Sequence, residues 1–318
     1  MRGSSAARCI ARVDALDRGY FQRGGAVRPR VAHGGHMNVS HASEVSSQTS
    51  PAGTRARLAG KVAIVTGATQ GLGADIARAL ANEGAGVLIA GLDDAAGHAL
   101  AASIGTSARF AHTDVTDDAR LDSTIATALA AFGGLDIVVN NACSYDDAGL
   151  ASTREQWSRL LDVNLVSAAI LAQKAAPHLR RGGVIVNLGS VGGKFGAAAR
   201  ALYPASKAAL LQLTRNLAVE LAPHGLRAVS VSPAWTWSPS LERLAGGSVD
   251  VADRVGRPLH ALGRVGRGDE IGRVVAFLCS DDAAWITGID VPVDGGFSIL
   301  GPDQGRSPRE WFERHAAQ

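Results

Sequence analysis

The chain has 318 residues, of which 46% are hydrophobic and only 5% aromatic, and it contains 38 glycines. This composition is typical of an α/β protein and excludes a disordered or fibrous chain. No apolar run approaches the roughly 18 residues that a membrane-spanning helix needs, so we expect no membrane contact.

Charge and cysteine usage narrow the possible partners further. The formal net charge is +3, but residues 1–36 hold seven arginines and two acids, and the rest has 25 basic and 27 acidic side chains. This mildly acidic remainder gives no reason to expect nucleic acid as a partner. Cys9, Cys143 and Cys279 have neither disulfide nor metal-ligand spacing, which predicts a cytoplasmic protein that binds no metal.

Residues 1–57 have no sustained apolar period and are rich in arginine, glycine, serine and histidine, which predicts a disordered N-terminal extension. The excess of arginine resembles an organelle transit peptide. Alternatively, the native protein starts at Met37. His33, His36 and His41 could gather a metal, but without acids or cysteines nearby we interpret them as part of a solvated tail.

The first regular elements form a strand, a glycine turn and a helix. Lys61–Thr66 is predicted to be a buried strand, Gly67–Gly73 a turn, and Ala74–Asn82 a helix that Gly84 ends. Glycines let backbone N–H groups approach a pyrophosphate, which then lies at the positive end of the helix dipole. This arrangement predicts a nucleotide-binding turn.

Strands and helices alternate along the rest of the chain. Further strands are predicted at residues 87–91, 108–112, 136–139, 184–188, 227–231 and 289–296. Helices are predicted at 117–132, from a capping box at 153–156 towards 179, around Tyr203, and at 269–280. This order predicts one domain over residues 58–300 with a doubly wound parallel sheet of about seven strands, helices on both faces, and a C-terminal tail over 301–318. The last strand contains Pro292 and is therefore expected at the sheet edge.

Tyr203, Lys207 and Ser190 form the most informative constellation. A spacing of four places Tyr203 and Lys207 on one face of a helix, where a lysine ammonium would lower the pKa of the phenol towards the value that general acid/base catalysis needs. Ser190 follows an apolar run and is expected at the carboxyl end of a strand, where open α/β sheets bind ligands. The alternative is a surface tyrosine and lysine on an amphipathic helix.

The sequence resembles the short-chain dehydrogenase/reductase family over about residues 58–300. The resemblance is carried by several motifs in order, namely Thr66–Gly73 with its three glycines, Asp114-Val115, Asn140-Asn141-Ala142, Asn164, Ser190, Tyr203 with Lys207, and Val293-Asp294-Gly295-Gly296.

The resemblance implies a role for each member of the catalytic set. Tyr203 would exchange a proton with the substrate oxygen, and Ser190 would hold and polarise that oxygen. Lys207 would lower the pKa of the phenol and bind the nicotinamide ribose, and Asn164 would bind a water that relays protons. A nicotinamide cofactor would supply the hydride chemistry, with no metal.

The resemblance also implies a set of cofactor contacts: Gly67, Thr69, Gln70, Gly71, Leu72, Gly73, Leu92, Asp93, Asp114, Val115, Asn141, Ala142, Cys143, Tyr203, Lys207, Pro233, Thr236 and Ser238. Two of these regions depart from the usual pattern. Cys143 stands where the family usually has glycine, and Pro233-Ala234 replaces Pro-Gly.

The end of the second strand bears on the choice of cofactor. NAD-preferring members carry an acid where Gly91 stands, and NADP-preferring members often carry arginine where Leu92 stands. Asp93 and Asp94 would repel a 2′-phosphate, so we expect NAD(H) to be favoured over NADP(H). Alternatively, the same two acids stabilise the N-terminus of a helix, where the helix dipole favours negative charge.

The expected function is the interconversion of a secondary alcohol and a ketone on a small or medium apolar substrate. Residues 234–256 are expected to form a lid, and Trp235, Trp237 and Phe195 either line the substrate site or pack elsewhere. The alternatives are a 3-oxoacyl thioester (acyl-carrier-protein) reductase and, in another class, a nucleotide-binding regulator or scaffold without turnover.

Two helices predict self-association. The segments 155–179 and 203–221 carry apolar residues beyond one core-facing stripe, which favours a second partner surface. In this family such helices pair across a two-fold axis, so we expect a homotetramer, with a dimer as the second possibility. The residues concerned are Leu160, Leu161, Leu165, Ile170, Leu171, Leu210, Leu211, Leu213 and Leu217.

Overall fold

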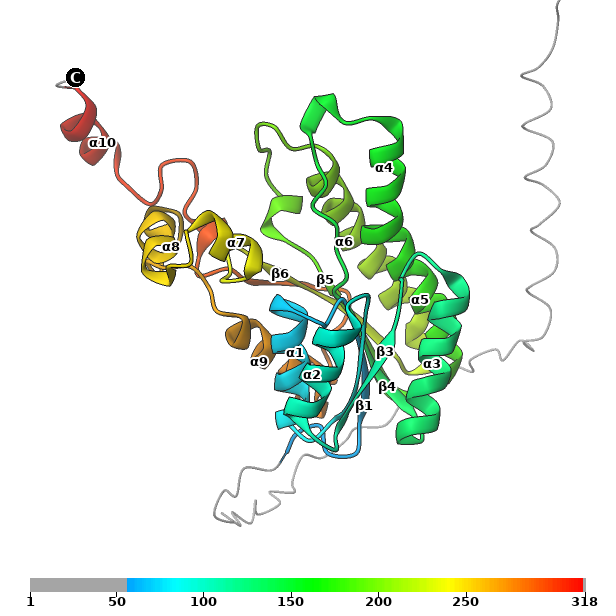
Figure 1. Cartoon of the computed structure of the whole chain (residues 1–318). Coiled ribbons are helices and arrows are strands. Elements are labelled where there is room, and N and C mark those ends of the chain that lie inside the picture. Colours follow the sequence, from blue (N-terminus) through cyan, green and yellow to red (C-terminus); the bar gives the residue numbers. More distant parts are fainter. Residues whose placement is uncertain (1–55, 317–318) are drawn as a thin grey trace, which may run out of the picture. The chain divides into compact units, whose positions relative to one another are not determined.

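The computed structural model describes residues 56–316, and its centre is one parallel sheet of seven strands in the order β3-β2-β1-β4-β5-β6-β7 (Figure 1). The strands are β1 (Val62–Thr66), β2 (Gly86–Gly91), β3 (Ala108–His112), β4 (Leu135–Asn140), β5 (Leu179–Leu188), β6 (Arg227–Pro233) and β7 (Asp290–Val293). The predicted doubly wound parallel sheet is therefore confirmed.

The strand order reverses between β1 and β4. From β1 the chain moves outward to β2 and β3, and it then returns to β4 on the other side of β1 and continues outward to β7. In such sheets the loops after the two central strands diverge and leave a crevice at the carboxyl ends, where ligands bind. The fold thus places the glycine turn after β1 beside the segment after β4.

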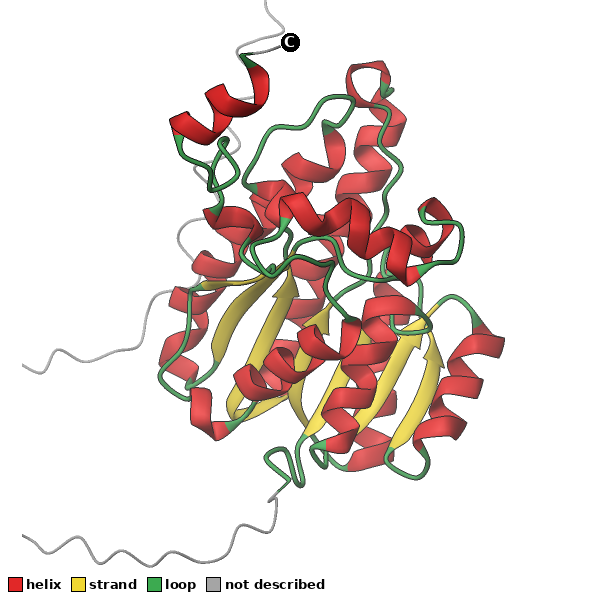
Figure 2. Ribbon diagram, turned by 90° about the vertical axis from the view of Figure 1, so that its left-hand side faces the viewer, coloured by secondary structure: helices red, strands yellow, loops and turns green. Residues whose placement is uncertain are grey.

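Helices cover both faces of the sheet (Figure 2). Ile76 of α1 and Val275 of α9 belong to the apolar core on one face, while Ile125 of α3 and Leu171 of α5 belong to the core on the other. The helices are α1 (Gly71–Asn82), α2 (Asp94–Ile104), α3 (Asp118–Phe132), α4 (Arg154–Leu161), α5 (Ser167–Ala175), α6 (Leu202–Leu221), α7 (Pro239–Leu244), α8 (Val249–Gly256), α9 (Gly268–Cys279) and α10 (Pro308–His315).

The structure confirms the start of the long helix predicted from residue 153 towards 179 but differs from the prediction in its middle and at its end. The capping box is confirmed, because Thr153 Oγ1 accepts from Gln156 N at 3.3 Å and Gln156 Oε1 accepts from Thr153 N at 2.9 Å. A π-helical segment, Asp162–Val166, separates α4 from α5, and Leu179 already belongs to β5, paired with Leu135.

The two ends of the chain are described to different extents, because the described residues begin at 56 and end at 316. Met37 and the three N-terminal histidines lie outside the described residues, as does nearly all of the predicted extension. Arg57 is described, and its guanidinium binds Glu83 at 2.6 Å. Helix α10 was not predicted, although Ser307 and Glu310 form a capping box at its start. Within residues 56–316 no helix is long and apolar enough to cross a membrane.

The edge position of the last strand is confirmed. Among the strands of residues 56–316, β7 pairs with β6 alone, and Pro292 lies opposite Ser232 in that pairing. Proline has no N–H to donate to a further strand, so it is compatible with an edge and would break the ladder of a central strand.

Candidate active site

The glycine turn after β1 is closed tightly against the segment after β4. Gly67 has a φ of 61°, and a Cβ there would lie 2.7 Å from Ala142 Cα. A Cβ at Gly73 would overlap Asn141 Nδ2 and lie 2.5 Å from Gly67 O. Both positions therefore require glycine, the first for its conformation and both for space.

Asn141 and Thr66 brace this turn. Asn141 Nδ2 donates to the carbonyl oxygens of Thr66 at 2.9 Å and Gly67 at 3.1 Å. Thr66 Oγ1 accepts from the backbone N–H groups of Asn141 at 3.0 Å and Ala142 at 3.1 Å. Thr66 was quoted in the sequence motif but not among the predicted site residues, because its contacts are to a strand more than 70 residues away.

The start of α1 has the properties of a phosphate-binding site. Gln70 is the N-cap residue, and no side chain caps the helix, so the first backbone N–H groups have no partner within the helix. Their direction and the helix dipole suit a pyrophosphate. Pro239 of α7 lies directly over the turn, because a Cβ on Gly71 would be 3.1 Å from Pro239 Cδ. The turn thus fits the nucleotide that its sequence predicted.

The end of β2 contains no lysine or arginine side chain. A Cβ at Gly91 would lie 2.7 Å from Thr69 Cγ2, so the glycine packs against the turn. Leu92 is 63% exposed. Asp93 caps α2 by accepting from Ala96 N at 3.0 Å, and Asp94 contacts His112 Nδ1 at 2.7 Å. The alternative of helix N-terminal acids that favour the dipole also fits, since Asp93 is the N-cap residue of α2 and Asp94 lies in its first turn.

Asp114 and Val115 follow β3 at the same end of the sheet. Asp114 Oδ1 accepts from Thr116 N at 3.0 Å and from Thr116 Oγ1 at 2.7 Å. These two hydrogen bonds keep the pKa of the Asp114 carboxyl below its usual range. Val115 is buried in the core, whereas the neighbouring Asp114 carboxylate is half-buried.

Tyr203 and Lys207 lie on α6 and are both buried, with 8% and 3% of their surfaces exposed. Lys207 Nζ lies 5.7 Å from the centre of the Tyr203 ring and donates to Leu188 O at 2.7 Å. Ser190 follows β5, and its Oγ accepts from Gly192 N at 3.0 Å. The structure therefore brings together the three side chains that the sequence separates by up to 17 positions.

The pKa of Tyr203 is raised to about 12. Burial is the main cause, and the nearby Cys143 thiol adds to it, while hydrogen bonds with Ser190 and Tyr145 and the charge of Arg200 act in the opposite direction. Lys207 is not among the main causes of this shift, and its ammonium donates to the Leu188 carbonyl. Its lowering of the pKa of the phenol stays a prediction.

Asn164 lies in the π-helical segment and is 2% exposed. Its Oδ1 accepts from Ser144 N at 2.7 Å, and its Nδ2 donates to Ser144 O at 3.0 Å and to Ser206 Oγ at 3.1 Å. Single π-helical turns inside α-helices often occur at functional sites. Here the turn directs a polar side chain from α4–α5 towards α6, and both amide hydrogens are used.

Several side chains around Tyr203 were not predicted as site residues. The Tyr145 ring stacks on the Tyr203 ring with centroids 5.0 Å apart and an interplanar angle of 21°. The Arg200 guanidinium lies 5.5 Å from the centre of the Tyr203 ring. Both come from irregular segments, where no periodic pattern marks which side chains face inward. Cys143 is half-buried in the same region, and its Sγ lies 3.4 Å from Ser144 O.

The remaining predicted contacts follow β6. Pro233 is buried at the end of that strand, Thr236 Oγ1 donates to Ala234 O at 3.1 Å, and Ser238 caps α7. Ser238 directly precedes Pro239, which covers the glycine turn.

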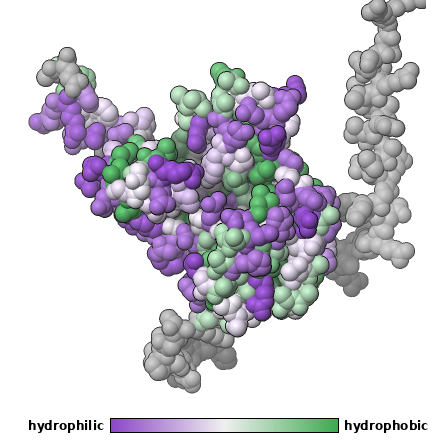
Figure 3. Space-filling model, viewed as in Figure 1, coloured by the Kyte–Doolittle hydropathy of each residue, from purple (hydrophilic) through white to green (hydrophobic). Residues whose placement is uncertain are grey.

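Aromatic residues form the neighbouring surface. Trp235 is 42% exposed and Phe195 is 47% exposed. Phe195 lies 6.2 Å from Phe297, and His260 lies between Phe297 at 5.5 Å and Trp235 at 6.4 Å, measured between ring centroids. Figure 3 shows hydrophobic residues gathered over α7 and α8, where Leu244 and Val255 are exposed.

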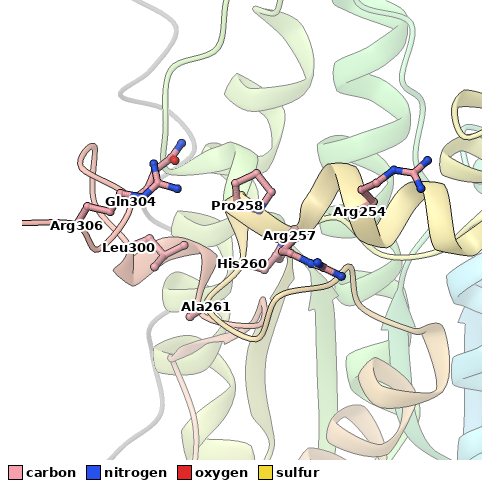
Figure 4. A pocket seen from close by; sticks show the side chains of 8 residues that line it. All are labelled: Arg254, Arg257, Pro258, His260, Ala261, Leu300, Gln304 and Arg306. Carbon is pink, nitrogen blue, oxygen red and sulfur yellow. The ribbon is translucent and has the colours of Figure 1, made fainter. Parts of the chain in front are cut away.

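A separate hollow of about 390 Å³ adjoins His260 (Figure 4). Its lining contains none of the predicted site residues. Arg254 and Arg257 extend in one direction from α8 and the turn that follows it, while Gln304 and Arg306 lie on the opposite side of Pro258. We therefore place the candidate active site at the Tyr203 crevice and not in this hollow.

Comparison with known proteins agrees with this geometry. Residues 67–298 match a family model described as enoyl-(acyl carrier protein) reductase. The chain is 37% identical over 262 residues to an L-fucose dehydrogenase from Oryctolagus cuniculus, covering 81% of this chain and 90% of that protein.

Two other relatives carry different substrate names. The chain is 35% identical to a 3-alpha-(or 20-beta)-hydroxysteroid dehydrogenase from Mycobacterium bovis, over 76% of this chain and 90% of the relative. It is 36% identical to a galactitol 2-dehydrogenase from Agrobacterium fabrum, over 76% of this chain and 98% of the relative. With the parallel sheet and the glycine turn, these matches show that the chain belongs to the short-chain dehydrogenase/reductase family and is a nicotinamide-dependent dehydrogenase or reductase.

Proposed function

We propose that this protein interconverts a secondary alcohol and a ketone, with Tyr203 as the group that exchanges a proton with the substrate oxygen. The observation that carries the proposal is the buried Tyr203 phenol, which lies beside Lys207 and shares Gly192 as a neighbour with Ser190 after β5. Since its pKa is about 12, the phenol carries its proton at neutral pH and is ready to donate it to a developing alkoxide.

The other predicted residues have supporting roles in this proposal. Ser190 donates a hydrogen bond to the substrate oxygen and stabilises the charge that develops on it. Lys207 binds the nicotinamide ribose through its ammonium. Asn164 orders Ser144 and Ser206, and a relayed water would have to donate to Asn164 Oδ1, because both amide hydrogens are already used. The bound nicotinamide supplies the hydride chemistry.

For the cofactor we propose NAD(H) over NADP(H). A 2′-phosphate at the end of β2 would meet the exposed, uncharged Leu92 and the carboxylates of Asp93 and Asp94. His112, which pairs with Gly91 in the sheet, already contacts Asp94 at 2.7 Å. An unpaired phosphate next to like charges binds less well, so discrimination against NADP(H) is mainly repulsive.

For the substrate we propose a small or medium compound with an apolar part. The support is the partly exposed aromatic side chains of Phe195 and Trp235, which follow β5 and β6 in the chain. The relatives are named for a sugar, a polyol and a steroid, so the test panel contains secondary alcohols and ketones of all three classes. Turnover is followed by the absorbance of reduced nicotinamide, with both cofactors. Failure of every member of the panel to react, while the cofactor binds, would refute the proposal.

A second candidate is reduction of a 3-oxoacyl thioester on an acyl carrier protein. It is favoured by the description of the matching family model, which names an acyl-carrier-protein substrate. The same tyrosine would protonate the 3-oxo oxygen. An acetoacetyl thioester added to the panel separates the two candidates, because the first predicts that it reacts no faster than simple ketones.

We also propose a homotetramer, with a dimer as the second possibility. Leu160, Leu171, Leu210 and Leu211 are buried within the same chain and do not contribute. Support remains in Val166 and Val219, which are 44% and 77% exposed, and in a shallow hollow along α4 lined by Leu161 and Val166 among polar neighbours. Light scattering at micromolar concentration tests this proposal, and a monomeric mass would contradict it.

A further inference from the structure

The helix that carries Tyr203 begins without a cap of its own. Ala201 is the N-cap residue, with φ −140° and ψ −49°, and no side chain of the helix itself or of Ala201 caps it. The first N–H groups of any helix lack partners within the helix, and a helix start that is partly buried needs acceptors from elsewhere. Tyr203 is the second residue of α6, so its own N–H belongs to this group.

Asp147, which follows β4, supplies these acceptors. Its Oδ1 and Oδ2 each lie 3.0 Å from Ala201 N, and Oδ2 accepts from Tyr203 N at 2.9 Å. Oδ1 also accepts from Gly149 N at 2.9 Å. Burial raises the pKa of the Asp147 carboxyl, but these backbone hydrogen bonds outweigh burial, and the pKa is lowered below its usual range. The negatively charged carboxylate also lies at the positive end of the helix dipole, which stabilises the start of the helix.

The segment that carries Asp147 is held at its other end by Asn164. The two hydrogen bonds between the Asn164 amide and the backbone of Ser144 have lengths of 2.7 and 3.0 Å. Between these anchors lies Tyr145, whose ring stacks on that of Tyr203. One short segment therefore joins the π-helical residue Asn164 to the backbone of Tyr203.

The loop before α6 is under conformational strain. Ala199 has a φ of 58°, a left-handed conformation that residues other than glycine rarely adopt. Gly149 packs against it, since a Cβ on Gly149 would lie 3.0 Å from Ala199 C. Such a conformation persists only when neighbouring contacts hold it, and the bonds from Asp147 to Ala201 are contacts of this kind.

We infer that Asp147 is a positioning residue that fixes the start of α6, and thereby the Tyr203 phenol, relative to Ser190. The inference rests on the proposed role of Tyr203. Small displacements of a reacting group reduce rates strongly, so a start of α6 that frays should lower kcat while leaving the glycine turn and cofactor binding intact.

The test compares Asp147→Ala and Asp147→Asn with Asp117→Ala. Asp117 is a matched control, because it caps α3 by accepting from Ala119 N at 2.8 Å and Arg120 N at 3.2 Å, away from the Tyr203 crevice. We expect Asp147→Ala to lower kcat by about tenfold or more with the KM of the cofactor within about threefold. Asp147→Asn should recover part of the loss, because its amide oxygen still accepts, whereas Asp117→Ala should lower Tm without lowering kcat.

The outcomes separate this inference from the proposed function. If Tyr203→Phe is inactive while both Asp147 variants keep kcat within about twofold of the wild type, the positioning role is overturned and the catalytic role of Tyr203 stands. Equal losses of kcat in Asp117→Ala and Asp147→Ala would also overturn it, because loss of any cap would then suffice. If Asp147→Ala does not fold, the comparison of Asp147→Asn with Asp117→Asn decides in the same way.

Discussion

Replacing Gly73 by alanine is a demanding test of the closed glycine turn, because helix propensity and packing predict opposite results. Gly73 lies in the first turn of α1 with an ordinary φ, and alanine is favoured over glycine inside a helix by about 1 kcal/mol. The new Cβ, however, would overlap Asn141 Nδ2 and lie 2.5 Å from Gly67 O and 2.9 Å from Ala68 Cα. Two of these three atoms are backbone and cannot move independently.

We expect the free-energy cost of packing the new methyl group to exceed the gain in helix propensity. Inserting a methyl group into a filled site costs about 1–3 kcal/mol, and displacing Asn141 weakens its two hydrogen bonds to the turn, each contributing about 1 kcal/mol. After subtracting the gain in helix propensity, we expect a net destabilisation of about 2–4 kcal/mol. For a domain of this size that corresponds to a fall in Tm of roughly 4–16 °C.

The assay is thermal unfolding combined with fluorescence titration of the cofactor, which we expect to bind at least about tenfold more weakly to Gly73→Ala. Gly196→Ala is the control, because a Cβ at Gly196 has no neighbour within 4 Å and its φ is ordinary. A Gly73→Ala protein that is as stable as the wild type and binds cofactor normally would refute the geometry of the turn and the fit for a nucleotide.

The remaining predictions concern the proton, the cofactor and the extension. Because the pKa of Tyr203 lies above its ordinary value, the phenol stays protonated across neutral pH. The rate of ketone reduction should therefore be nearly flat from about pH 6 to 9, while the rate of alcohol oxidation rises. A reduction rate that falls with a midpoint near pH 7 would contradict this. Leu92→Arg should shift kcat/KM towards NADP(H) from a wild-type preference for NAD(H) of about tenfold or more, and no shift would argue against repulsive discrimination. A protein that begins at Met37 should match the full chain in Tm and activity, and a large loss of either would show that the preceding residues matter.

The sheet and the glycine turn could be predicted because local sequence determines them. The buried strand Lys61–Thr66 and the glycines at 67, 71 and 73 can be recognised from the sequence alone. The structure shows why Gly67 and Gly73 are needed, because a Cβ would press on Ala142 at the first and on Asn141 at the second. The edge strand was likewise marked by Pro292. In each case the signal lies within a few residues of the feature that it predicts.

The contacts that complete the site could not be predicted in this way. Asp147 accepts from Tyr203 N, a residue 56 positions later, and no local pattern distinguishes it from the neighbouring Asp146. The contacts of Asn164 with Ser144 and Ser206 likewise join segments 20 and 42 positions apart, which no local pattern marks. The raised pKa of Tyr203 was not predicted because its main cause is burial, and burial is a property of the folded chain.

The most direct test of the proposed mechanism is the turnover of Tyr203→Phe, measured beside Tyr145→Phe on the best substrate of the panel. The two variants remove one phenol oxygen each from rings stacked 5.0 Å apart. We predict that Tyr203→Phe loses about 100- to 10,000-fold in kcat, because the proton donor is gone, while cofactor affinity stays within a few-fold and Tyr145→Phe loses less than about tenfold. Near-normal turnover by Tyr203→Phe would contradict the mechanism.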